Sequence, residues 1–504
     1  MEYTELADYP LPAGTVTEWT PAADDHDWAD DDRRLSYVHL EHARRAHEVG
    51  DEWYSQWIGT AFTIDHPLCA DAMAATLQRW FARHEAFRST VTRHPDVDAN
   101  HLEDEFGRRI IAADKVSIAI ARDEEPSTSS AVYERINELF NTRISPLAWP
   151  HCLVTTVEPE DTPGSFLLVF GADHTVMDAY TQVFAIKELT RLYESALLGH
   201  DDSLATFGSY LDFSHAERAS GARLAADTVE VTRWANFLQA HSDATSITQP
   251  DPMPAFPRAL PASQSQVGPL TRVETTHSRF QGSLSTWLLD AEQTERFHRA
   301  SKAAGANMAA GIYTALSITT HRLSGTGDLR FISPVHTRTE LQWGEAAGWF
   351  VGLIPVHLRP GAARTFSEAI GPVAECAREY KDLGTVPFHP IADLIGHRTP
   401  PQFVVSYIDL RGAEGADQWD THDARVLRSA CASSDEVYFW INRIPTGTNL
   451  SARFPSHHPG ANDVHRFLRT FNDVLLEIVE AGDTGFDVET AMSAPGGQPG
   501  GLTS

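Results

Sequence analysis

Two long apolar runs, one in each half of the chain, most constrain how this sequence can fold. They are "SFLLVFGAD" (Ser165–Asp173) and "GWFVGLIPVHL" (Gly348–Leu358). Uninterrupted apolar runs of this length are typical of strands that are buried on both faces. Amphipathic patterns with the period of a helix lie next to such strands in the sequence, for example over residues 67–91 and 177–198. This alternation predicts an α/β (α+β) fold.

The length of 504 residues favours two lobes over one ordinary domain. A Pro-rich segment of small polar residues, 241–270, is the best candidate for the connection between them. The sequence predicts an N-terminal extension (1–34), a first lobe (35–240), this connection (241–270), a second lobe (271–485) and a disordered tail (486–504).

Charge and composition exclude several classes of function. A formal charge of −29 argues against a nucleic-acid groove or an anionic membrane as the partner. The four cysteines form no CxxC pair, and no HExxH motif occurs, so no metal site is expected. No run approaches 18 apolar residues, and the first residues lack the pattern of a signal peptide. A soluble, cytoplasmic protein without a transmembrane segment is expected.

A histidine and an aspartate four positions apart follow the first apolar run, in "GADHTVMDAY". His174 falls where a buried strand ends, a position that commonly exposes side chains to a cleft in α/β sheets. A neutral imidazole there can take a proton from an attacking hydroxyl or amine. Asp178 falls in the first turn of the next helix, where the helix dipole favours a carboxylate. A buried structural histidine followed by an ordinary first-turn acid would give the same spacing.

Further motifs occur in a fixed order around this pair. They are "RHEAFRST" (Arg83–Thr90), "GWFVGLIPV" (Gly348–Val356), "VPFHPIADLI" (Val386–Ile395) and "RTPPQFVVSYIDL" (Arg398–Leu410). Together they resemble the condensation-domain superfamily of chloramphenicol-acetyltransferase-like acyltransferases, from about Leu35 to Val479. The resemblance implies two lobes, each a mixed sheet with flanking helices, arranged as a V around a central tunnel.

Within this superfamily, "PLPAGTVTEWTP", the "DH" pair and "FGSYLDF" are similar to the free-standing polyketide-associated acyltransferases. The resemblance implies that His174 is the catalytic histidine in the tunnel. It implies an ion pair between Asp178 and Arg338 of "SPVHTRTEL" that supports the site. Three further residues are expected around the histidine or along the tunnel: Asp173, Ala179 and Trp349.

Two positions depart from the commonest "HHxxxDG" form of the motif. Asp173 replaces the first histidine, as the free-standing enzymes tolerate, and Ala179 replaces the final glycine. If position 179 needs a positive φ, alanine costs about 1 kcal/mol relative to glycine. If the position is helical, alanine is the better residue.

The resemblance implies direct acyl transfer from a thioester to a hydroxyl acceptor, such as a lipid or sugar alcohol, with His174 as general base. No bound cofactor is needed, because coenzyme A or a phosphopantetheine arm comes with the donor, which an acyl carrier protein could also present. Amide formation of the nonribosomal-peptide type is an alternative. A non-catalytic recruitment module with the same fold is another, motivated by Asp173 and Ala179. A monomer is expected.

Overall fold

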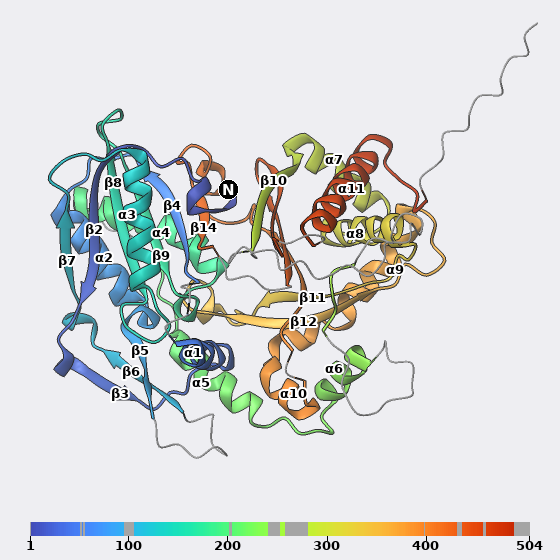
Figure 1. Cartoon of the computed structure of the whole chain (residues 1–504), viewed down its shortest axis with the longest axis horizontal. Helices are drawn as coiled ribbons and strands as arrows, with labels where there is room; N and C mark the ends of the chain where they lie inside the picture. The colour runs from blue at the N-terminus through green and yellow to red at the C-terminus, as the bar shows by residue number, and fades with distance from the viewer. Residues whose placement is uncertain are drawn as a thin grey trace, which may run out of the picture.

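The structure is a computed structural model in which two sheets form the centres of two lobes (Figure 1). It describes residues 2–50, 53, 56–94, 105–200, 204–239, 253–257, 281–397, 399–430, 436–456 and 460–487. Most of the predicted Pro-rich connection and of the predicted tail lies outside these residues. The structure confirms the predicted α/β fold with two lobes. The central tunnel stays a prediction.

A seven-stranded sheet forms the first lobe. Its strands, in spatial order, are β1 (Tyr3–Glu5), β14 (Arg425–Arg428), β4 (Ile58–Ile64), β9 (Phe166–Ala172), β8 (Cys152–Pro159), β2 (Gly14–Ala22) and β7 (Ser117–Arg122). Helices α2 (Ala70–Arg83) and α4 (Ala179–Leu198) pack on one face, and α3 (Ser129–Arg143) packs on the other. Strand β9 is buried along its whole length, as its apolar run predicts.

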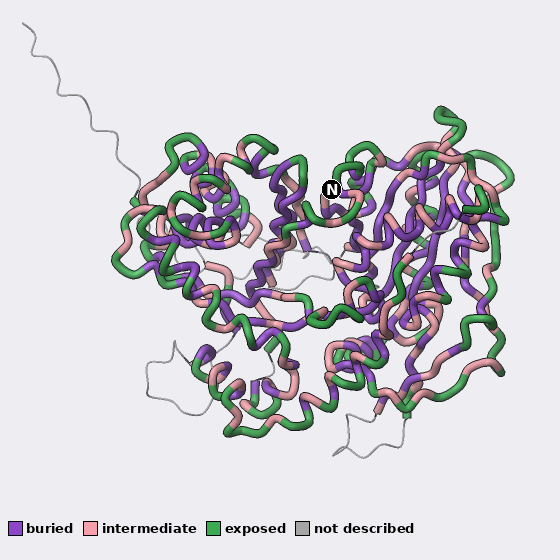
Figure 2. The backbone as a smooth tube through the Cα atoms, turned by 180° about the vertical axis from the view of Figure 1, so that it is seen from behind, coloured by how far each residue is buried: buried purple, intermediate pink, exposed green. Residues whose placement is uncertain are grey.

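A six-stranded sheet forms the second lobe. Its strands, in spatial order, are β10 (Gly282–Asp290), β16 (Gly447–Phe454), β15 (Val437–Ile444), β13 (Phe403–Asp409), β11 (Leu329–His336) and β12 (Val351–Leu358). The largest buried apolar cluster joins this sheet to helices that include α7 (Ala291–Ala303), α8 (Met308–Ser324), α9 (Phe366–Glu379) and α11 (Gly460–Ala481). Figure 2 shows that buried backbone runs through both lobes.

Smaller elements complete the fold. A three-stranded sheet has the order β3 (Trp28–Asp31), β6 (Phe106–Ile111), β5 (Ser89–Arg93). Helices α1 (Tyr37–Val49) and α5 (Tyr210–Gly221) contact each other below the first sheet, and α6 (Val229–Gln239) and α10 (Phe388–Ile395) contact each other below the second (Figure 1).

The sheets do not follow the predicted boundaries in two places. Strands β1 and β2, within the predicted extension 1–34, are part of the seven-stranded sheet. Strand β14 comes from the predicted second lobe, yet it pairs with β1 and β4 of the first. Strand pairing depends on contacts between distant residues, so short strands of this kind leave little local signal in a sequence.

The second apolar run is shorter as a strand than predicted. Strand β12 begins at Val351, and Gly348, Trp349 and Phe350 precede it. Gly348 has φ +154°, and a Cβ atom there would lie 2.3 Å from Cγ of Tyr210. A glycine is therefore needed at this position. The non-strand geometry of these three residues determines how Trp349 and Phe350 meet the HxxxD segment.

Candidate active site

The HxxxD segment lies between β9 and α4, and its two aspartates cap a short 3₁₀ turn and the start of α4. Asp173 precedes a 3₁₀ turn, His174–Val176, and its Oδ1 accepts a hydrogen bond from the amide of Thr175 at 2.9 Å. Asp178 is the N-cap of α4, and its Oδ1 accepts from the amide of Thr181 at 2.9 Å. Asp178 thus precedes the helix, whereas the sequence placed it in the first turn.

The imidazole of His174 stacks on the indole of Trp349. The ring centroids lie 4.1 Å apart with an interplanar angle of 25°. Nδ1 of His174 is buried and has no hydrogen-bond partner among the described residues, while the residue as a whole stays partly exposed. Because Trp349 belongs to the second lobe, the contact joins His174 to both lobes.

The surroundings of His174 lower its pKa. Burial is the main cause, and the nearby His42 acts in the same direction, while the carboxylates of Asp173 and Asp178 act in the opposite one. The net effect keeps the imidazole uncharged at neutral pH. An uncharged imidazole is the form that can accept a proton.

His42, on α1, completes the group of rings, and the sequence analysis did not identify it. Its Nε2 lies 3.4 Å from Oδ2 of Asp173, and its ring contacts Trp349 and Trp53 edge to face. Burial alone would raise the pKa of Asp173, but His42 and the amide of Thr175 outweigh burial and lower it. The sequence did indicate that such a partner is needed, because an aspartate at the end of a buried strand requires a cation or hydrogen-bond donors nearby.

Asp178 and Arg338 are in contact, as the resemblance implied. Nη1 of Arg338 donates to Oδ2 of Asp178, and Nη2 donates to Oδ1 at 2.9 Å. The amide of Phe350 also donates to Oδ2 of Asp178, at 3.1 Å. The side chains of Asp178 and Arg338 are only 9% and 4% exposed. The acceptor positions of this carboxylate therefore face donors that hold it in place.

The backbone conformation at position 179 shows whether alanine is strained there. Ala179 is the first residue of α4, and it is not among the described residues with positive φ. Alanine is therefore favourable here, because it has the best helix propensity. The replacement of glycine does not strain the segment.

Possible metal ligands lie elsewhere. Within the described ranges, the group with ligand atoms close enough to share an ion is Asp24, His26 and Asp27, whose atoms lie within 4.8 Å of one another. The group is largely exposed, as acidic surface clusters commonly are. Over the same ranges, no helix combines the length and the apolar character that crossing a membrane requires.

Comparisons with known proteins place this geometry in a family. The condensation-domain family profile matches residues 47–402. The acyltransferase PapA3 of Mycobacterium tuberculosis (strain CDC 1551 / Oshkosh) is 24% identical over 494 residues, 95% of this chain and 96% of that protein. The trehalose-2-sulfate acyltransferase PapA2 of Mycobacterium bovis (strain BCG / Pasteur 1173P2) is 25% identical over 459 residues, 88% of this chain and 89% of that protein.

Solved structures agree with the sequence comparisons on the fold. The structure of a PapA2 acyl transferase superposes with a TM-score of 0.79 at 22% identity, covering 95% of this chain and all of that one. The condensation domain of the Monacolin K polyketide synthase MokA gives a TM-score of 0.68 at 17% identity, covering 90% and 99%. The predicted resemblance is confirmed, and the chain belongs to the condensation-domain family.

Proposed function

We propose that this chain is a free-standing acyltransferase that moves an acyl group from a thioester to a hydroxyl acceptor and gives an ester. Its PapA relatives carry the name acyltransferase and match it over nearly its whole length. The observation that carries the proposal is the uncharged, partly exposed imidazole of His174, held by Trp349 where the two lobes meet.

His174 acts as the general base in the proposed reaction. Its Nδ1 is buried, so Nε2 is the nitrogen that a substrate can reach. Nε2 takes the proton of the acceptor hydroxyl while the oxygen attacks the thioester carbonyl carbon. The C–S bond then breaks, and the thiolate leaves with the proton from the imidazolium. The products are an ester and a free thiol, and no covalent acyl-enzyme forms.

The chain's other residues position this base. Trp349 fixes the plane of the ring by stacking, and Asp178 with Arg338 fixes the segment that carries it. General-base assistance is worth typically ~10²–10⁴-fold in rate, and orientation in a water-poor site adds to it. Coenzyme A or a phosphopantetheine arm is part of the donor substrate in this scheme.

Thiol release tests the proposal. Purified protein is mixed with a long-chain acyl-CoA and matched alcohol and amine acceptors, free thiol is measured, and the product is identified by mass. We expect an ester, and we expect His174→Ala to lower the rate at least about 100-fold without changing the melting temperature.

The control is His47→Ala, which removes an exposed histidine of α1. Near wild-type turnover by His174→Ala would move the chemistry to another residue. A clear preference for the amine would favour amide formation, and no thiol release from either acyl-CoA or an acyl carrier protein would favour a recruitment module.

A further inference from the structure

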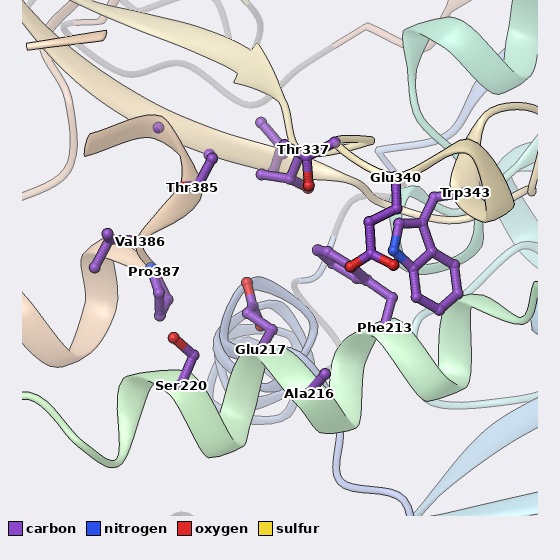
Figure 3. A pocket seen from close by; sticks show the side chains of 14 residues that line it. Phe213, Ala216, Glu217, Ser220, Thr337, Glu340, Trp343, Thr385, Val386 and Pro387 are labelled. Carbon is purple, nitrogen blue, oxygen red and sulfur yellow. The ribbon is translucent and has the colours of Figure 1, made fainter. Parts of the chain in front are cut away.

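A cavity of about 170 Å³ lies between α5 and the segments that follow β11 (Figure 3). Its walls come from both lobes. Phe213 and Glu217 of α5 form one side, and Thr337, Glu340, Trp343 and Thr385 belong to the other. Pockets for whole ligands commonly measure about 300–1,000 Å³, so this cavity has room for one part of a larger molecule.

Thr337 presents an unused polar group to this cavity. The residue is 7% exposed, and its Oγ1 has no hydrogen-bond partner among the described residues. Figure 3 shows the hydroxyl pointing into the cavity, toward the carboxyl group of Glu217. A buried hydroxyl without a partner costs free energy, so a ligand or water that bonds to it is favoured.

The charge of the lining limits what that ligand can be. Two carboxyl groups, of Glu217 and Glu340, face the cavity, and none of the fourteen lining residues is Lys, Arg or His. A sulfate or phosphate group would meet like charge and find no cation. The lining therefore disfavours anions.

Glu217 is only about half ionised at neutral pH. Burial raises its pKa to about 7. The amide of Tyr37, which donates to Oε2 at 3.0 Å, and the charge of Arg218 act in the opposite direction but are weaker. A half-protonated carboxyl group both donates and accepts hydrogen bonds, as a hydroxyl ligand requires. A half-ionised carboxyl group attracts an ammonium group less strongly than a fully ionised one, so this protonation favours an uncharged ligand.

Aromatic rings form the apolar part of the wall. Phe213 and Trp343 contact each other edge to face, with ring centroids 6.0 Å apart. Both line the cavity beside Glu340 (Figure 3). Aromatic faces next to carboxyl and hydroxyl groups suit a ring that has apolar C–H faces and a polar rim of hydroxyls.

The cavity is lined by residues that are chain neighbours of residues at the candidate active site. Thr337 precedes Arg338, which binds Asp178, and the amide of Thr337 donates to the carbonyl of Phe350 at 3.1 Å. Val351, which also lines the cavity, follows Phe350, whose amide donates to Asp178. A molecule held here lies against the segments that position His174.

We propose that this cavity binds an uncharged, polyhydroxylated ring of the acceptor, and that it discriminates against acceptors that place a sulfate or phosphate group there. The inference rests on the proposed acyl transfer to a hydroxyl. Thr337 and the two carboxyl groups hold the ring's hydroxyls, and another hydroxyl of the same molecule extends to His174.

Calorimetric titration tests the cavity without any donor or turnover. The probes are trehalose, trehalose-2-sulfate and an aminosugar analogue of trehalose. We expect trehalose to bind at least about tenfold more tightly than its sulfate. We expect Thr337→Val and Glu340→Gln each to weaken trehalose binding several-fold, and Glu340→Gln to narrow the preference over the sulfate. Glu345→Gln, an exposed acid of the same segment outside the lining, should change neither.

Thiol release measured in parallel separates the two proposals. Trehalose binding that depends on Thr337 and Glu340, without thiol release, would support the cavity and sink the acyltransferase. His174-dependent thiol release with a trehalose KM unchanged in Thr337→Val and Glu340→Gln would overturn the cavity. Tighter binding of the sulfate or of the aminosugar, or no trehalose binding, would also overturn it.

Discussion

A buried carboxylate beside a histidine changes how readily that histidine takes up a proton. Asp173 raises the pKa of His174, and His42, paired with Asp173 at 3.4 Å, lowers it. His42, Asp173 and Asp178 are the charged or titratable groups that influence His174 from α1, from the end of β9 and from the start of α4. At the scale of single residues, burial and this balance of charges together set the pH at which the base becomes active.

Opposite changes are therefore expected from neutralising the two partners. Because the pKa of His174 lies below its usual range, wild-type activity should persist to mildly acidic pH and fall only as the imidazole is protonated. Asp173→Asn should move this acidic limb of the kcat/KM profile to lower pH, and His42→Gln should move it to higher pH. The acidic limb of each variant is measured as kcat/KM between pH 4.5 and 8.5, and the melting temperature of each variant is recorded alongside. Shifts in the same direction, or none, would contradict an electrostatic role of the pair.

At the scale of elements, the Asp178–Arg338 pair ties the start of α4 to the segment after β11 and to the residue before β12. Removing one partner leaves an unpaired buried charge, which typically costs ~3–5 kcal/mol. Asp178→Ala and Arg338→Ala should each lower the melting temperature, and the double variant should lose less than the sum of the two.

Asp178→Asn removes the charge of the side chain but leaves its N-cap hydrogen bond in place. It keeps an oxygen for the amide of Thr181, so any loss comes from the ion pair and not from the N-cap, whose loss alone costs ~0.5–2 kcal/mol. His174→Ala should leave stability unchanged. Strictly additive losses in the double variant, measured by thermal or urea unfolding, would contradict the coupling.

The elements that the sequence could predict are those with local signals. The apolar run of β9 and the periodic patterns of α2 and α4 predict elements that the structure confirms. His174, Asp178 and Arg338 were identified because motifs in a fixed order carry them. His42 was missed because it is one of several histidines on α1, and only the fold brings it to Asp173. Glu217 and Thr337 were missed because their cavity forms between distant segments.

At the scale of the whole molecule, short strands that pair over long distances connect the lobes. Strand β14 from the C-terminal half lies inside the first sheet, between β1 and β4. The carbonyl of Tyr3 in β1 accepts hydrogen bonds from the hydroxyls of Ser285 in β10 and Ser451 in β16. The first described residues thus contact both central sheets, between the lobes (Figure 1).

Deleting residues 2–5 should therefore loosen both lobes. The side chain of Tyr3 is 7% exposed, and an aromatic side chain that buries roughly 150–250 Å² at about 25 cal/mol per Å² contributes several kcal/mol. We expect a melting temperature lower by several degrees and faster amide exchange in β14, β10 and β16. Exchange in β13, which pairs only within the second sheet, should change less.

Glu2→Gln is the matched control, because it removes only the ion pair between Glu2 and Arg425. The two side chains are 24% and 32% exposed, respectively. Surface pairs of this kind contribute ~0–1 kcal/mol. A shortened chain with wild-type melting and exchange would show that the lobes are held together without β1.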